Sequence, residues 1–95
     1  MRKYELVTVL RPDIGDDEVQ QVIERLQEAV RSRGGQVEQV DHWGRRKLAY
    51  PIKKYLEGNY VLSHIQMDPD RTQDLERGLL LSEDVIRHLL VRLDA

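Results

Sequence analysis

The sequence predicts a two-layer α+β sandwich in which two helices cover one face of a four-stranded antiparallel sheet. Two stretches repeat their apolar residues with a helical period, and four are rich in β-branched and apolar residues. Their order is βαββαβ, and two split βαβ units with right-handed crossovers give a ferredoxin-like arrangement. Because 95 residues suffice for one hydrophobic core, we expect a single domain over residues 1–95.

The first strand is predicted over residues 4–10. Both of its faces are partly apolar, as in a strand with neighbours on both sides, and Pro12 ends it because proline cannot donate to a β-ladder. A helix is predicted over residues 16–33, with acids in its first turn, where the helix dipole favours them, and Gly34-Gly35 after its end. Its apolar stripe consists of Val19, Val22, Ile23, Leu26, Ala29 and Val30.

The second strand is predicted over residues 36–52, and Gly44 in its middle indicates a bulge or a twist. The dipeptide Gly58-Asn59 is a turn signal. We therefore expect a turn within residues 55–59 and a third strand over residues 60–67, so that the second and third strands form a hairpin.

Asp68 and Pro69 predict the start of the second helix, because aspartate is a favoured N-cap and proline a favoured first helical residue. This helix is predicted to end near Leu81, and the fourth strand to span residues 85–93. By the alternation of side chains along a strand, Arg87 is expected on the helix-free face of the sheet. The residues expected to face the helices are Ile86, His88 and Leu90.

The most informative segment runs from Trp43 to Lys54. It contains no acid, and its cations are Arg45, Arg46, Lys47, Lys53 and Lys54. Because the net charge of the whole chain is only −2, positive charge is concentrated in this segment and the rest of the chain is acidic. This pattern favours a sheet edge that meets a polyanion. The alternative is that the cations keep an edge strand soluble.

Composition narrows the function further. The chain has no cysteine, which excludes disulfides, thiolate metal sites and cysteine nucleophiles. No apolar stretch approaches the roughly 20 residues of a membrane-spanning helix. The three histidines, His42, His64 and His88, lack the spacing of a zinc motif. We therefore expect no cofactor, no metal, no small-molecule substrate and no membrane association.

Four segments occur at places that match a known family: MRKYELVTVLRP at the start, WGRRKLAYPIKK in the second strand, GNYVL in the third and VIRHLLVR in the fourth. Together they resemble the bacterial small-subunit ribosomal protein S six family, and GRRKLAYPIK resembles its signature segment. The resemblance implies a non-enzymatic, cytoplasmic component of the ribosome. It also implies binding to ribosomal RNA of the central domain, or platform, of the small subunit, together with the small-subunit ribosomal protein S eighteen.

With this resemblance, the segment from Trp43 to Lys54 becomes the leading RNA-binding candidate. Arg2 and Lys3 begin the first strand, where they either contact phosphates or form a solvated end. Arg87 on an apolar face indicates a covered surface; an ion pair with Glu5 is the other interpretation, and both can hold together. The RNA-binding residues expected are Arg2, Lys3, Arg45, Arg46, Lys47, Lys53, Lys54, Arg87 and Arg92.

The helix-free face is expected to expose an apolar patch, which is either packed by a protein partner or covered by the chain's own long side chains. Trp43 and Tyr50 suit stacking on bases but are more often packing anchors. The partner contacts expected are Val7, Val9, Trp43, Tyr50, Leu62, Leu89 and Val91. The competing function is a ferredoxin-like ligand-binding or dimeric α+β-barrel enzyme domain, for which only His64 and Glu5 offer polar groups.

Overall fold

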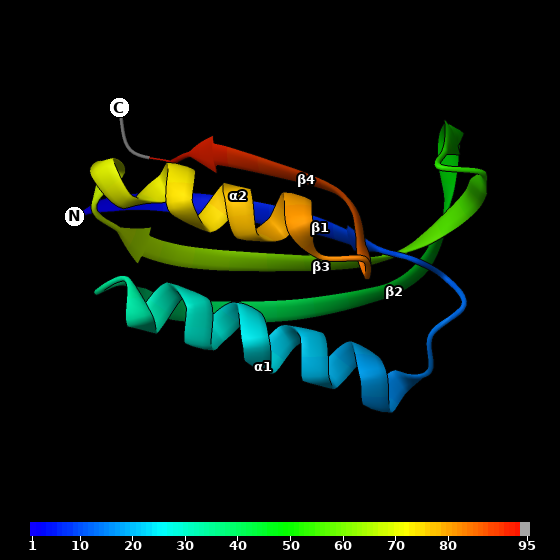
Figure 1. The fold of residues 1–95 in the computed structure, drawn as a ribbon, viewed down its shortest axis with the longest axis horizontal. Helices are drawn as coiled ribbons and strands as arrows, with labels where there is room; N and C mark the ends of the chain where they lie inside the picture. The colour runs from blue at the N-terminus through cyan, green and yellow to red at the C-terminus, as the bar shows by residue number, and fades with distance from the viewer. Residues whose placement is uncertain (94–95) are drawn as a thin grey trace.

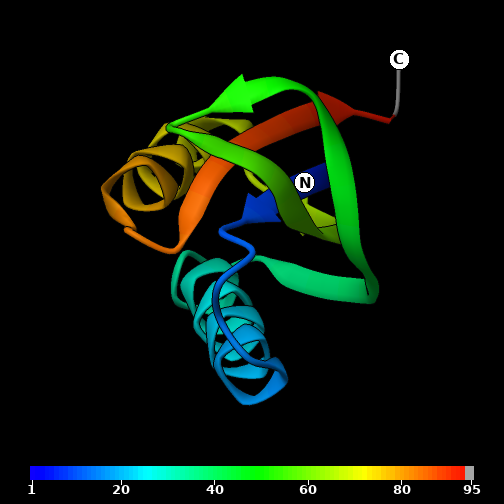
Figure 2. The same cartoon turned by 90° about the vertical axis from the view of Figure 1, so that its right-hand side faces the viewer.

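The computed structural model describes residues 1–93, and its elements follow the predicted order (Figure 1). They are β1 Arg2–Leu10, α1 Asp16–Ser32, β2 Gln36–Ile52, β3 Tyr55–Met67, a short 3-10 helix Pro69–Arg71, α2 Thr72–Leu81 and β4 Val85–Arg92. The strands form one antiparallel sheet in the order β2-β3-β1-β4. Both helices lie on one face of this sheet (Figure 2), which confirms the predicted α+β sandwich.

The main hydrophobic core lies between the helices and the sheet. Leu6 and Leu10 of β1, one of the two inner strands, are fully buried, and Val19 and Leu26 of α1 belong to the same cluster. Burial of a leucine or valine side chain contributes about 1.5–3 kcal/mol. The helix layer is therefore held to the sheet chiefly by these apolar contacts.

Glycine ends α1 as the sequence predicts. Gly34 has a φ of 78°, and the N–H groups of Gly34 and Gly35 donate to the carbonyls of Arg31 and Val30, both at 2.9 Å. This pair of hydrogen bonds is the Schellman motif, which needs a left-handed residue and so favours glycine. The chain turns sharply there and enters β2.

The turn of the β2–β3 hairpin lies at Lys53-Lys54, and the predicted turn within residues 55–59 is wrong. Ile52 pairs with Tyr55, and the two lysines between them have φ values of 49° and 74°. Positive φ at both central residues is the geometry of a two-residue type I′ turn, which matches the twist of the strands it joins. Neither lysine is a residue that signals such a turn, so the sequence pointed to the nearby Gly58-Asn59 instead.

The end of this hairpin, residues 43–58, bends over the helix-free face and is called the hairpin arm. Gly44 has a φ of 84°, and the β2–β3 register shifts after His42 and again after Lys47. The bulge predicted at Gly44 is therefore confirmed, and bulges increase the local twist of a strand. Figure 2 shows the arm curving across the end of the sheet towards β4, with α1 on the opposite side.

Close packing under the arm explains why residue 58 is a glycine. A Cβ added there would lie 2.3 Å from Val9 Cγ1 and 3.7 Å from Ile86 Cδ1. Val9 and Ile86 are only 3% and 7% exposed, although neither belongs to the core under the helices. The arm therefore covers a second, smaller apolar cluster on the helix-free face.

Two predictions are corrected by this cluster. Val9 is not exposed, because the arm covers it. Ile86 does not face the helices, because the β1–β4 register pairs Val9 with Arg87 and Leu10 with Val85, which leaves Ile86 as the extra residue of a β-bulge. A bulge interrupts the alternation on which the prediction depended.

Candidate nucleic-acid and partner interfaces

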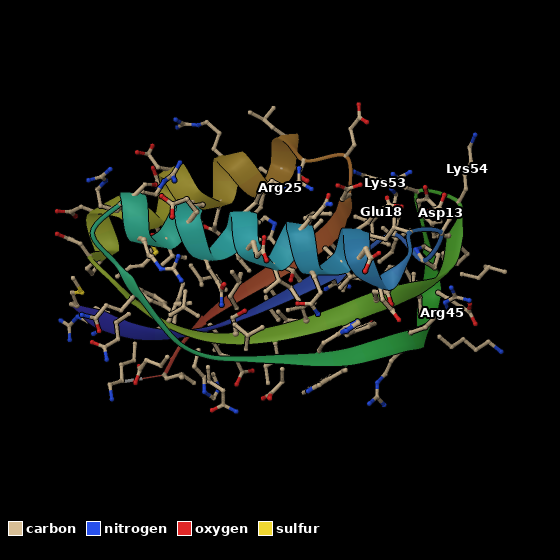
Figure 3. The ribbon with its side chains drawn as sticks, turned by 90° about the horizontal axis from the view of Figure 1, so that it is seen from below. Asp13, Glu18, Arg25, Arg45, Lys53 and Lys54 are labelled. Atoms are coloured by element: carbon tan, nitrogen blue, oxygen red, sulfur yellow. The ribbon has the colours of Figure 1, made fainter. Side chains whose placement is uncertain are left out.

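The five arm cations are exposed to solvent. Figure 3 labels Arg45, Lys53 and Lys54 at one end of the molecule, and Lys54 at the tip points away from the ribbon. Within residues 1–93, Arg45 is the only arm cation with a carboxylate within 4.0 Å, that of Glu57, and its side chain is still 57% exposed. The arm thus presents its cations outward rather than onto the chain's own acids.

Arg45 also holds the arm in place. Its Nη2 donates to the backbone carbonyl of Pro12 at 2.8 Å, and Asn59 Nδ2 donates to the carbonyl of Arg11 at 3.3 Å. Both bonds tie the hairpin to the loop that follows β1. Arg45 therefore has a structural role in addition to any contact with an external anion.

Two other arginines are occupied by one carboxylate. Arg11 Nε donates to Asp84 Oδ1 at 3.0 Å, and Arg25 Nη2 donates to Asp84 Oδ2 at 3.3 Å. The hydrogen bond that Arg11 donates to Asp84 is the main reason that the pKa of Arg11 is raised. Asp84 thereby joins the start of β4 to the loop after β1 and to α1. These arginines serve the fold, which agrees with their absence from the expected RNA-binding set.

Arg46 lies over the indole ring of Trp43, with 5.6 Å between the guanidinium carbon and the ring centroid. A cation–π contact of this kind at an exposed site contributes about 0.5–1 kcal/mol. Trp43 is 48% exposed, so the pair forms a platform that is open to solvent. The indole of Trp43 orients the guanidinium without neutralising it.

Arg87 and Tyr50 connect the arm to the far edge of the sheet. Arg87 Nη1 donates to the hydroxyl of Tyr50 at 2.8 Å, and both side chains are exposed. The alternative of an ion pair between Arg87 and Glu5 is wrong, since Glu5 lies 3.4 Å from His64 Nε2. Arg87 therefore joins the arm, although β4 is the edge strand opposite β2.

The structure does not bring all nine candidate cations together. Arg2 pairs with Met67, and Tyr4 pairs with Arg92, at the end of the sheet that lies away from the arm. Eight residues of strand separate Arg2 from Leu10, a distance of roughly 26 Å. Arg2, Lys3 and Arg92 thus form a second basic site, the terminal site, and the arm with Arg87 forms the first.

The apolar candidates occupy the helix-free face to different extents. Leu89 and Val91 of β4 are 51% and 42% exposed, and Tyr50 of the arm is also exposed. Val7 and Leu62, which pair across β1 and β3, are half-buried. Val7 pairs with Leu62 on one side and with Leu89 on the other, so these residues lie together on the helix-free face, while Trp43 is an exposed residue of the arm.

One residue of this face was missed in the sequence. Tyr60 pairs with Val9 and lines a shallow depression of about 220 Å³ together with Val7, Arg87 and Leu89. The wrong turn prediction placed Tyr60 at the start of a strand, where its cross-strand neighbour could not be identified. Alternation along that strand puts Tyr60 on the same face as Leu62, which pairs with Val7, so the sequence did contain a signal for this residue.

Polar groups on the sheet do not assemble into a metal or catalytic centre. His88 Nε2 lies 3.1 Å from Glu76 on α2, as expected for a histidine that faces the helices, and His64 lies beside Glu5. Within residues 1–93, no cluster of three or more potential ligands is placed to hold a metal. No helix in that range is both long and apolar enough to cross a membrane.

Comparisons with known proteins agree with this geometry. The family model described as Ribosomal protein S6 matches residues 3–92. The small ribosomal subunit protein bS6 of Moorella thermoacetica is 45% identical over 94 residues, which cover 99% of this chain and 96% of that protein. The bS6 protein of Caldanaerobacter subterraneus subsp. tengcongensis is 44% identical over 99% of both chains. The crystal structure of 30S ribosomal protein S6 from Thermotoga maritima superposes with a TM-score of 0.91 at 30% identity, covering 97% of this chain and 87% of that one.

Proposed function

This chain belongs to the ribosomal protein S6 family and is a small-subunit ribosomal protein, and from that premise we propose that it binds ribosomal RNA of the central domain together with protein S eighteen. Its relatives are named as small-subunit ribosomal proteins, so the expected non-enzymatic role and the location in the cytoplasmic ribosome are confirmed. The contacts with RNA and with S eighteen are the proposal.

The observation that carries the RNA contact is the outward direction of the arm cations. The segment has no acid between Trp43 and Lys54, and Glu57 is the one carboxylate within 4.0 Å of an arm cation in the described residues. Figure 2 shows α1 and the arm on opposite sides of the sheet, and Figure 3 shows that Glu18, in the first turn of α1, lies at the same end of the molecule as Arg45, Lys53 and Lys54. A polyanion would therefore approach the arm and be repelled from the helices.

The arm would contact RNA at its phosphates rather than at base edges. Proteins recognise folded RNA mostly by shape and by phosphate and ribose contacts, and a guanidinium fork suits phosphate oxygens. Arg46 on Trp43 and Arg87 on Tyr50 are oriented by aromatic side chains, which reduces the entropy lost when they bind. The terminal site of Arg2, Lys3 and Arg92 would make a separate phosphate contact.

The protein partner would pack on the apolar surface between the arm and β4. Trp43, Tyr50, Leu89 and Val91 supply its exposed part, and Val7 and Leu62 its floor. Val9 is excluded because the arm covers it. Since this surface adjoins the basic arm, RNA and protein partner would share a border, and each would favour binding of the other.

The rival function, a ligand-binding or barrel-forming enzyme domain, has less support. Such a domain needs convergent polar groups in a cavity. The depression described on the helix-free face is shallow, and its lining is largely apolar. Glu5 and His64, the polar groups that the rival requires, contact each other instead.

A binding titration with central-domain ribosomal RNA tests the proposal. The variant Arg46→Glu, Lys47→Glu, Lys54→Glu, called the arm variant, keeps Arg45 and so preserves its bond to Pro12. We expect the arm variant to lose at least tenfold in affinity, and the wild type to bind more tightly when S eighteen is present. The matched control has the same change in net charge.

That control is Arg31→Glu, Arg71→Glu, Arg77→Glu, which reverses three exposed arginines of the helix layer. It should bind RNA within about threefold of the wild type, because exposed i,i+3 ion pairs contribute little. Equal losses in the two variants would show that net charge, rather than the arm, decides binding. Identical curves with and without S eighteen would remove the cooperative part of the proposal.

A further inference from the structure

A groove of about 500 Å³ lies in the helix layer, between α1 and α2. The two helices run side by side on one face of the sheet (Figures 2 and 3). Its walls are largely apolar, and Val22 and Leu26 of α1 line it together with Leu75 and Leu79 of α2. Small-molecule sites have volumes of about 300–1,000 Å³ and apolar walls with a few polar groups. The described residues that line this groove belong to neither the arm nor the terminal site.

Gly78 keeps the α2 side of the groove open. Glycine destabilises the interior of a helix relative to alanine. Gly78 does not have a positive φ, and a Cβ added there would meet no atom within 4 Å. Neither the backbone nor the packing of the described residues therefore requires a glycine at this position. Gly78 and Ala29, small residues on the two walls, leave room for a bound molecule.

Arg33 gives the groove an unpaired polar group. Its Nη1 donates to the carbonyl of Ala29 at 2.9 Å, but its Nε is buried and has no hydrogen-bond partner within residues 1–93. No carboxylate in that range lies within 4.0 Å of this guanidinium, as the ion pairs of the structure show. A buried donor without an acceptor calls for an explanation, and a missing ligand is one.

Charge differs between the two ends of the groove. α1 and α2 run in opposite directions (Figure 1), so Arg33 lies at one end, and Glu83 and Asp84, which follow α2, lie at the other. Asp84 is already bonded to Arg11 and Arg25. The end at Arg33 is therefore cationic and the opposite end carries the acids, so an anion is favoured only beside Arg33.

We propose that this groove binds a medium-chain carboxylate, with its apolar chain between the helices and its carboxylate at Arg33. Arginine binds carboxylates through parallel charge-assisted hydrogen bonds, which would supply the acceptor that Arg33 lacks. The chain would cover Leu26, Leu75 and Leu79 and occupy the space above Gly78. This site is independent of the RNA and protein contacts proposed above.

An NMR titration of the full chain with hexanoate, octanoate, octanol and octylamine tests the proposal. Octanoate should bind about 10- to 15-fold more tightly than hexanoate, because each further buried CH₂ contributes about fourfold. It should bind about 3- to 30-fold more tightly than octanol, since its carboxylate pairs with a half-buried cation. Octylamine should bind more weakly than octanol. The largest shifts are expected at the amides of Ala29, Leu75 and Gly78.

Three variants assign the binding to the groove. Gly78→Leu fills the groove and should abolish the shifts, and the protein should stay folded because leucine favours a helix more than glycine does. Arg33→Gln should still bind octanol but lose the preference for octanoate. Arg31→Gln is the matched control, because Arg31 is exposed and paired with Glu28 outside the groove, and it should keep that preference.

Equal affinities for octanoate and octanol, tighter binding of octylamine, or octanoate shifts that persist in Gly78→Leu would each overturn the proposal. Shifts confined to Tyr60 and Leu89 would place the binding in the depression on the helix-free face and would also refute it. None of these readouts involves RNA, so their failure leaves the RNA proposal intact.

Discussion

Substitution of Gly58 by alanine should destabilise the protein because the arm packs so closely on Val9. The new Cβ would lie 2.3 Å from Val9 Cγ1 and 3.3 Å from the carbonyl oxygen of Leu10. The valine methyl is on a stiff, buried side chain, and the carbonyl belongs to β1, an inner strand of the sheet. Neither can give way without moving the arm or β1.

The expected magnitude follows from overpacking. Extra methyl groups forced into a packed cluster cost about 1–3 kcal/mol in the free energy of unfolding. For a domain of this length, each kcal/mol lowers Tm by about 4–8 °C. The assay is urea unfolding of Gly58→Ala, Val9→Ala and the double variant. Val9→Ala removes the clashing methyl group. By itself it should lower the free energy of unfolding by about 1–2 kcal/mol, because buried apolar surface is lost.

The double variant makes this prediction specific to the contact. If the clash exists, the double variant should lose less free energy of unfolding than the two single variants lose together. The difference should be at least about 1 kcal/mol. Gly78→Ala is the control, since nothing lies within 4 Å of the position and the exposed helix should gain about 0.5–1 kcal/mol. Additive losses, or a Gly58→Ala variant as stable as the wild type, would refute the packing argument.

Three further changes probe the arm. Gly44→Ala places a side chain at a φ of 84° and should cost about 1–2 kcal/mol in thermal unfolding, with the arm amides showing the largest NMR shifts. Lys53→Asn with Lys54→Gly suits the type I′ turn and should raise stability by about 0.5–1 kcal/mol, whereas a double glutamine variant should not. Tyr50→Phe removes the hydrogen bond to Arg87 and should weaken binding of RNA with S eighteen by about 2- to 10-fold, with circular dichroism unchanged; unchanged binding would show that the bond does not position Arg87.

Periodicity and composition predicted the layers of the fold, because α1 and the strands obey simple rules of alternation. The core residues Leu6, Val19 and Leu26 lie where those patterns place them. The prediction of the hairpin was wrong at its turn. A type I′ turn formed by two lysines carries no turn signal in the sequence. Residue 58 is a glycine because a side chain there would clash with Val9, and the sequence alone cannot distinguish such a glycine from one required by a turn.

The exposure of the arm cations could be predicted from the sequence, but the way the structure groups the candidate residues could not. Localised charge identified the arm cations, and the structure shows all of them exposed. The separation of Arg2 and Lys3 from the arm depends on register, and the contact between Tyr50 and Arg87 depends on the bend of the hairpin. Both depend on tertiary structure, which no local sequence pattern determines. The same bend covers Val9, which alternation alone placed at the surface.

The salt dependence of binding to central-domain ribosomal RNA tests the proposed contact between the arm and RNA most directly. Each phosphate contact contributes about 0.7–0.9 to the slope of log K against log salt concentration. The arm variant should have a slope smaller than that of the wild type by about 2–3, while the variant with Arg31, Arg71 and Arg77 reversed keeps the wild-type slope. Equal slopes for all three proteins would contradict the account, because the arm cations would then not be contacting phosphates.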